Sequence, residues 1–432
     1  MNLNATDGLQ NVIAELGTPK DKASVWTYAV RHQSNIELEN IYRSSWLGRK
    51  IVDVPVDDMT RCWRTWHAED GLVDRIEAAE RKFDIRRKMS EALRWARLFG
   101  TSAIIIGTKS GRPDEPLDVE QMAQGDLQFL HLAVSPGLIV KDWETDFNSP
   151  RFGQPSLYTF TPASPGSTMT GSVDVHASRV IPFTGVELPP NASRGLTSWG
   201  DSVYTSILDT LVTAGSITSV IASLVLEAKL DVVKIADLGA LLSTPGGEDK
   251  IRKRFALAAS LKSVNNMLLL GEGEEYDQKT LNFAGLSDIH IRIMQEVSGA
   301  ADIPATRLLG QTPAGLQASG QSDLRNCYDM IQARQETSLR GALERCDRVV
   351  FASEGVELPR EAYFSFNALW QETSTQKADN ALKKAQATKA LQSSGLIDEA
   401  ALAKGVVSQL IEDGVYPGLD AAVKDAREQT GH

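Results

Sequence analysis

Hydrophobic positions recur every three or four residues along much of the chain, the spacing that places them on one face of an α-helix. Pro55 falls inside the first such stretch and predicts a break or a new first turn there. Asp201 and Ser287 are placed to cap the helices that follow them. The pattern predicts helices at residues 36–59, 72–84, 86–98, 201–228, 247–264, 287–300, 321–351, 373–393 and 397–413.

Shorter apolar or alternating stretches predict strands between these helices. Residues 102–107 read SAIIIG, an apolar run bounded by glycines that is typical of a buried strand. Residues 266–283 resemble a hairpin around Gly271 and Gly273. The other predicted strands are 63–68, 138–143, 156–161, 230–235 and 363–366. Together these elements predict an α+β fold that is mainly helical.

The stretch from Thr210 to Leu226 contains no charged residue. It is slightly short for a bilayer, and six Ser and Thr residues interrupt it. Its small side chains allow another helix to approach closely. The sequence therefore favours a helix that packs against neighbours along its length, with a membrane span as the less favoured alternative.

Residues 302–320 contain five Pro and Gly residues and are too long for a simple connection. Long loops inside compact proteins tend to be functional, so this segment is a candidate functional loop.

The composition fits an ordinary soluble protein that does not coat nucleic acid. The 432 residues carry a formal net charge of −11, whereas proteins that neutralise phosphates usually have a basic surface. Three widely spaced cysteines suit a reducing cytosol, and the start of the chain lacks a secretory signal pattern.

The sequence motifs do not predict a catalytic or phosphate-binding site. The run GEGEEYDQKT at 271–280 has the glycines of a phosphate loop, but its acidic residues would repel phosphate. Asp57 and Asp58 could be a carboxylate pair, yet neighbours on a helix point about 100° apart, so we expect a solvent-exposed or capping role. Arg61, Arg64 and His67 could pair with them. We therefore expect no enzyme, catalytic residue, cofactor or metal.

Five stretches in order resemble the portal proteins of tailed bacteriophages and prophages. The first is YRSSWLGRKIVDVPVDDMTRCWR at 42–64, and the most specific is IPATRLLGQTPAGLQASGQSDLRNCYDMIQARQE at 303–336. The others are GTSAIIIG at 100–107, SPRFGQPSLYTF at 149–160 and VHASRVIPFTG at 175–185. The resemblance extends from about residue 36 to about residue 400.

The resemblance implies a portal architecture of wing, stem, clip and small crown. The implied parts are an N-terminal arm at 1–35, a wing domain at 36–200, a stem helix at 201–229, a clip at 230–286, a returning stem helix at 287–301, a tunnel loop at 302–320, a long wing helix at 321–352 and a C-terminal wing and crown at 353–432. The short C-terminus makes an extended helical barrel above the crown doubtful.

The implied function is a ring, typically dodecameric, at one capsid vertex of the virion, assembled in the bacterial cytoplasm. Double-stranded DNA would pass through the ring without sequence specificity during packaging and ejection. The implied partners are terminase, which would hydrolyse ATP, then a head–tail adaptor, and the major capsid protein or scaffold, with no membrane. The alternatives are another minor head protein of a phage and, less favoured, a membrane pore.

Two groups of residues are site candidates. A loop with amides and one cation could make weak backbone contacts with DNA, although Arg307 could instead pair with an acid and hold the loop. Clip residues could contact partners or form an ordinary solvated face. The loop candidates are Arg307, Gln311, Thr312, Gln317 and Gln321, and the clip candidates are Lys250, Arg252, Lys253, Arg254, Glu272, Glu274 and Glu275, with Asp277 beside them.

Overall fold

Two compact units make up the chain in the computed structural model, Met1–Asn367 and Ala368–His432. The structure describes residues 30–162, 171–189, 199–226, 229–234, 243–254, 256, 275–280, 285–310, 321–370, 374–395, 398, 402–403, 405–407, 410 and 422–423.

The described part of the chain begins with helices α2 (Asn35–Ser44) and α3 (Trp46–Arg61). The break between them is at Ser45, whose side chain accepts a hydrogen bond from the Gly48 N–H and so caps α3. The break predicted at Pro55 is therefore wrong, because Pro55 lies buried inside α3.

The helix tolerates this proline because a side chain supplies the missing hydrogen bond. Proline has no N–H for the carbonyl of the residue four positions earlier, here Ile51. Arg97 of α5 (Ile85–Phe99) donates from Nη2 to that oxygen at 2.9 Å. A side chain of α5 thus satisfies the backbone carbonyl that Pro55 leaves without a partner in α3.

The predicted buried strand is the centre of a two-layered β region. Strand β2 (Thr101–Thr108) pairs antiparallel with β3 (Leu127–Val134) and β7 (Val180–Thr184). A second sheet has the order β4 (Leu138–Trp143), β5 (Pro155–Phe160) and β6 (Val173–His176). Ala103 and Ile105 of β2 share a buried cluster with Tyr158 and Val175 of the second sheet, while α5 contacts β2.

Distant parts of the chain meet at a third, two-stranded sheet. Strand β1 (Arg64–His67) pairs with β10 (Tyr363–Phe366). Arg64 is buried there and bonds to both oxygens of Asp347 at 2.5 and 2.7 Å. Its Nε also donates to Glu80 of α4 (Asp70–Phe83) at 2.8 Å, so one guanidinium joins β1, α4 and α12 (Arg340–Glu354).

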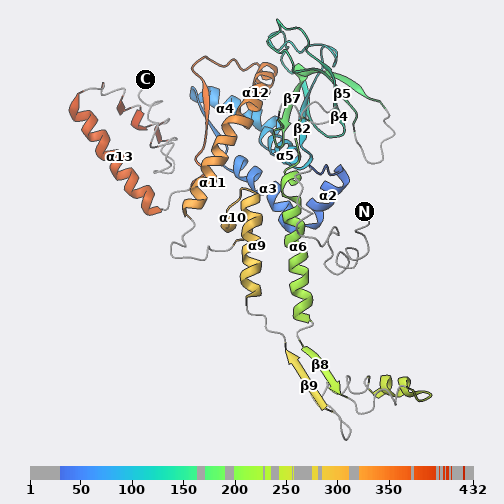
Figure 1. Ribbon diagram of the computed structural model, residues 1–432. Helices are drawn as coiled ribbons and strands as arrows, with labels where there is room; N and C mark the ends of the chain where they lie inside the picture. Colours follow the sequence, from blue (N-terminus) through green and yellow to red (C-terminus); the bar gives the residue numbers. More distant parts are fainter. Residues whose placement is uncertain are drawn as a thin grey trace, which may run out of the picture. The chain divides into compact units, whose positions relative to one another are not determined.

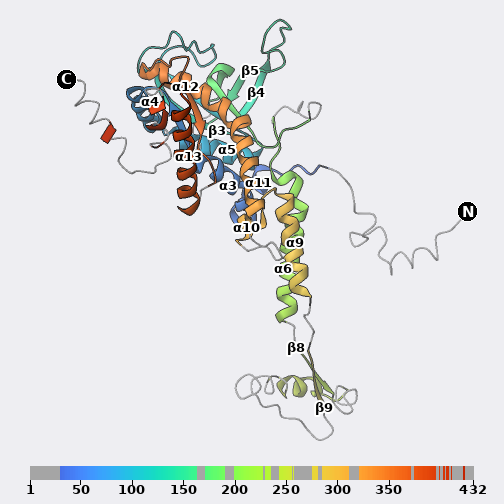
Figure 2. The same cartoon turned by 90° about the vertical axis from the view of Figure 1, so that its left-hand side faces the viewer.

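The long uncharged stretch forms helix α6 (Tyr204–Leu226), which lies beside α9 (Leu286–Ala300) in both views (Figures 1 and 2). The predicted caps are wrong. Asp201 instead forms a β-bridge with Val186, and the Ser202 hydroxyl accepts from the Tyr204 N–H. The second helix follows Gly285, whose φ of 90° suits glycine, so Ser287 lies within its first turn.

Between these helices the chain forms strand β8 (Lys229–Lys234), which pairs antiparallel with β9 (Glu275–Thr280). The predicted hairpin at 266–283 placed the second strand correctly, while its other half lies outside the described residues. Residues 247–254 are helical, as predicted.

The long helix predicted at 321–351 is interrupted. It consists of α11 (Gln321–Arg334), a π-helical turn (Gln335–Leu339) and α12. Gln335 is fully buried, and its Nε2 donates to the Met59 oxygen near the end of α3 at 2.7 Å. The π-helical turn therefore begins at the residue whose side chain makes this contact. In the second unit, α13 (Ser374–Ser394) matches the predicted helix.

Candidate functional site: the base of the loop

The candidate loop begins with a folded anchor. Within the segment predicted as a loop, residues 305–309 form the short helix α10 (Ala305–Leu309), which packs on α3. Leu308 is fully buried in the core shared by α2, α3, α5, α6 and α9. The Lys50 ammonium donates to the Leu308 oxygen at 2.7 Å. The chain leaves this helix through Gly310, with a φ of 70°.

Arg307, a DNA-contact candidate, is held by a buried carboxylate. Its Nη2 and Nε donate to the two oxygens of Asp58 at 2.6 and 3.1 Å. Asp58 is completely buried and also bonds to Arg61 at 3.0 Å. The hydrogen bond with Asp58 raises the pKa of Arg307. Arg307 therefore pairs with an acidic side chain, as in the alternative interpretation given for it above.

The remaining loop candidates lie at or beyond the edge of the described chain. Gln311, Thr312 and Gln317 fall outside the described residues. Gln321 is the first residue of α11. The structure therefore fixes both ends of the loop, at α10 and α11.

The clip candidates occupy two elements. Lys250, Arg252, Lys253 and Arg254 lie on the helical stretch 247–254 with exposed side chains. Arg252 forms an ion pair with Asp249 three residues earlier. Glu275 begins β9 opposite Lys234, and Asp277 lies on the same strand opposite Val232. Glu272 and Glu274 lie outside the described residues.

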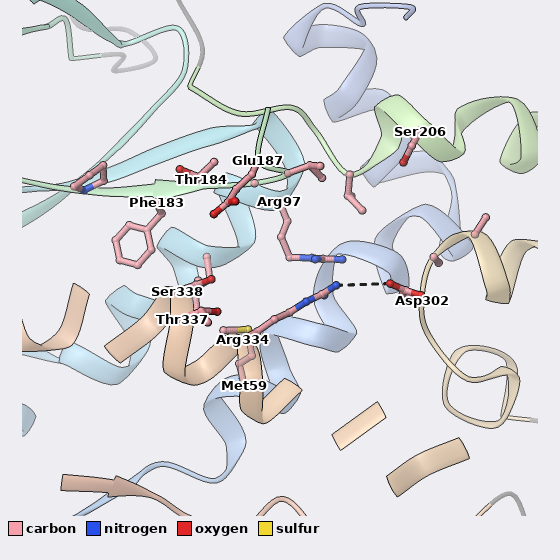
Figure 3. A pocket seen from close by; sticks show the side chains of 17 residues that line it. Met59, Arg97, Phe183, Thr184, Glu187, Ser206, Asp302, Arg334, Thr337 and Ser338 are labelled. Carbon is pink, nitrogen blue, oxygen red and sulfur yellow. Dashed lines mark ion pairs between the residues drawn. The ribbon is translucent and has the colours of Figure 1, made fainter. Parts of the chain in front are cut away.

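Beside the loop base is a polar pocket of about 550 Å³ (Figure 3). Arg97 and Arg334 point into it together, and Arg334 pairs with Asp302 at 3.9 Å. Burial, assisted by the charge of Arg334, lowers the pKa of Arg97 to about 10. Its lining comes from α5, the start of α6, the end of α9, and the place where α11 meets the π-helical turn.

The adjacent acids Asp57 and Asp58 do point apart, as expected. Asp57 is more than half exposed and pairs with Arg94 at 2.8 Å, whereas Asp58 is buried with Arg307. They do not form a carboxylate pair for metal binding. Within the described ranges, no group of three or more His, Cys, Asp or Glu could hold a metal ion. Of the expected partners, Arg61 bonds to Asp58, whereas Arg64 bonds to Glu80 and Asp347.

Sequence reasoning missed Asp58 as the anchor of the loop. The two residues are 249 positions apart, and the pairing depends on how α10 packs on α3. The signal that could have found it is the carboxylate of Asp58 on the apolar face of the first predicted helix, at residues 36–59.

Helix α6 is also the single described helix that is long and apolar enough to cross a membrane. Residues 204–225 have a mean hydropathy of 1.6, with 17% of the apolar window buried. This is weak evidence for a span, and the exposed apolar surface equally suits contact with other protein.

The fold is shared with solved structures. A chain in the neck of a native gene transfer agent particle, computed with C12 symmetry, superposes with a TM-score of 0.52 at 13% identity. The match covers 88% of this chain and 93% of that one. A chain in the neck of an empty particle of the same kind gives a TM-score of 0.50 at 12% identity. The chain therefore shares its fold, which is α+β and mainly helical, with these two chains.

Residues 36–390 match the family model for phage portal proteins. The chain belongs to the phage portal protein family. Its function is accordingly structural, within the phage particle, as the resemblance implied.

Relatives matched along nearly the whole chain carry other names. Two, from Caulobacter sp. (strain RHG1) and Sphingomonas paeninsulae, are named anti-CBASS protein Acb1. They are 37% and 35% identical over 97% of this chain and 68% of their own length. A Haemophilus influenzae protein of unassigned function is 30% identical over 97% of this chain and 93% of its own.

Proposed function

We propose that copies of this chain form a ring at one capsid vertex through which double-stranded DNA is packaged and later ejected. Terminase would dock on the clip during packaging, and a head–tail adaptor would replace it. The major capsid protein or scaffold would hold the outside of the ring. The ATP hydrolysis that drives packaging would belong to terminase.

The observation that carries this proposal is the exposed apolar surface of the α6–α9 pair. Val212, Val220 and Val225 of α6 are each more than half exposed, as is Ile289 of α9. An apolar surface of this kind marks a contact site. Neighbouring copies packed side by side would cover it and enclose a hole.

The low charge of α6 also suits a channel that must not hold DNA. Asp209 is the one charged residue within α6. Phosphate contacts supply most of the affinity of nonspecific DNA binding, so a helix without cations of its own, such as α6, would let the duplex slide. The twelvefold symmetry of the similar neck structure supports twelve copies as the working number.

We infer that Arg307 anchors the tunnel loop rather than touching DNA. Its bond to buried Asp58 supports this role. The DNA contacts would then come from the amides and hydroxyl of Gln311, Thr312, Gln317 and Gln321. Neutral donors of this kind make weak contacts that are independent of base sequence.

The ring is tested by expressing the chain and measuring the mass and negative-stain images of the purified assembly. We expect closed rings in the soluble fraction without detergent. A chain that stays monomeric under all assembly conditions contradicts the proposal. Recovery only with detergent, with residues 204–225 protected by lipid, would instead favour the membrane pore.

The loop is tested by replacing residues 311–319 with a Gly/Ser linker. We expect rings to form normally while DNA packaging or retention falls. The matched control is Arg307→Ala, which removes the anchor and leaves the amides in place; we expect a smaller loss. Unchanged packaging by the linker variant would exclude a DNA role for the loop.

The relatives named anti-CBASS proteins favour a second candidate role. About a third of each lies outside the match. We propose that the matched part is a portal portion and that the anti-CBASS function belongs to the unmatched part. Expression of this chain alone in cells with an active CBASS system should then leave phage defence intact. Loss of defence would assign the anti-CBASS role to this chain as well.

A further inference from the structure

The hairpin that joins β4 to β5 carries two exposed aromatic rings at its tip. Phe147 is 82% exposed and Phe152 is 52% exposed. The rings contact each other edge to face, with centroids 5.3 Å apart. We call this pair the tip knob. Large apolar side chains clustered on a surface mark a site of contact with another molecule.

An apolar groove of about 370 Å³ lies beside the other end of the same sheet. It is formed where the sheet of β2 and β3 meets the ends of β5 and β6. Phe129 and Val173 in its wall are largely exposed, at 54% and 43%. Ile106, Phe160 and Arg179 complete the part of the lining that a docking partner would meet.

One rigid strand keeps the knob and the groove apart within a single copy. At the tip end of β5, Pro155 pairs with Trp143; at the groove end, Phe160 pairs with Val173. Extended chain of this length spans about 17 Å. Since the hairpin leaves β5 at its Pro155 end, and neither Phe147 nor Phe152 lines the groove, a copy does not fill its own groove with its own knob.

The two surfaces are also complementary in charge. Between the two strands the tip carries Glu144 and Asp146 against one cation, Arg151. Arg179 lies buried at the groove and donates to the Glu115 backbone oxygen at 3.1 Å and to the Thr108 hydroxyl at 2.6 Å. In the part of the chain that the structure describes, no carboxylate forms an ion pair with it. The carboxylates of Asp126 and Glu115 act on the charge of Arg179 through space, but its printed hydrogen bonds go to neutral oxygens, so a further acidic neighbour would still be favourable.

We propose that the tip knob of one copy docks into the apolar groove of the next copy. The acidic tip then approaches Arg179 while the phenyl rings enter between Phe129, Phe160 and Val173. Contacts between two different surfaces run head to tail, and they close into a ring when the rotation between copies allows it. This inference rests on the proposed ring and adds a specific contact in its wing region.

Cysteine cross-linking tests the contact. A chain carrying both Phe147→Cys and Val173→Cys should give a ladder of cross-linked oligomers under mild oxidation. An equal mixture of the two single variants should give cross-linked dimers and nothing larger, because each copy then has one half of the contact. Leu358→Cys in place of Val173→Cys is the matched control for an exposed thiol elsewhere, and the parent chain reports on native Cys62.

A second variant measures the strength of the contact. Removing both rings in Phe147→Ala/Phe152→Ala should raise the concentration needed for half-maximal ring formation roughly tenfold or more. Both substitutions are at exposed positions, so the circular dichroism spectrum should not change.

The outcomes separate this inference from the proposed function. Rings that form without cross-links, or at an unchanged concentration in the double alanine variant, overturn the knob-in-groove contact and leave the ring intact. A parent chain that forms no rings overturns both.

Discussion

Arg64 is a buried cation that joins three elements of the first unit. Its side chain is fully buried between Asp347 and Glu80, and its guanidinium lies over the rings of Trp66 and Phe364 at 4.8 and 4.5 Å. One guanidinium therefore makes contacts that link three elements remote from each other in the sequence. Such a group stabilises the fold only while all of its partners are present.

Arg64→Met should lower the free energy of unfolding by about 3–5 kcal/mol, because it leaves two buried carboxylates without a counter-ion. The measurement is urea unfolding followed by tryptophan fluorescence. Arg81→Ala is the control, since its pair with Glu77 is exposed and should cost less than about 0.5 kcal/mol. Equal losses in the two variants would contradict a special role for Arg64.

Asp347 gives this cluster a dependence on pH. Burial raises the pKa of Asp347 to about 6, although Arg64 opposes the shift. The native state then binds a proton more tightly than the unfolded chain does. The free energy of unfolding that Asp347 contributes should therefore fall as pH rises from about 4 to about 6, by up to about 3 kcal/mol.

Asp347→Asn should remove that slope. Urea midpoints measured from pH 4 to pH 7 for the parent and the variant give the difference directly. If the difference between them is flat across this range, Asp347 does not titrate as its burial implies.

At the scale of elements, helix α3 depends on its neighbour α5. Pro55 leaves the Ile51 carbonyl without its helical partner, and Arg97 supplies the hydrogen bond. Arg97→Met should cost about 1–3 kcal/mol when Pro55 is present. In a Pro55→Ala background, the substituted alanine supplies its own N–H to that carbonyl, so the same change should cost about 1 kcal/mol less.

A double-mutant cycle by urea unfolding measures this coupling. Purely additive effects would show that Arg97 stabilises the fold through its other contacts alone.

The periodicity of apolar residues was enough to locate most helices and strands, because each element buries one face. It could not find the break at Ser45, because Pro55 is the stronger local signal for a break. The free Ile51 carbonyl that Pro55 leaves is satisfied by Arg97, which lies on another helix. The π-helical turn at Gln335 was hidden for the same reason. Its side chain bonds to Met59, and periodicity along α11 and α12 does not record such a contact.

The candidate site was predictable as a segment and not as a set of contacts. The breakers at 302–320 marked the loop, but Asp58 and Arg307 meet only after α10 packs on α3. The family was recognisable from the motif at 303–336, because that segment combines Pro, Gly and amides in an unusual order.

At the scale of the whole molecule, a charge on the exposed face of α6 tests the ring. Val220→Glu should leave the stability of the single chain within about 0.5 kcal/mol, because Val220 is already exposed. In a ring, the carboxylate would be buried between copies, so assembly should fail. Mass measurement of the purified protein reports the outcome.

Leu358→Glu is the matched control, an exposed leucine away from the stem helices. Rings formed equally well by both variants would show that copies do not meet along α6.

The near absence of ions along α6 also sets how the assembly should respond to its surroundings. Contacts made by aliphatic and small side chains weaken as water is cooled, and concentrated sulfate strengthens them. Electrostatic contacts lose strength in concentrated salt, but contacts along α6, which carries a single carboxylate, have little to lose. We therefore expect contacts between copies along α6 to persist in concentrated salt and to weaken on cooling to about 0 °C.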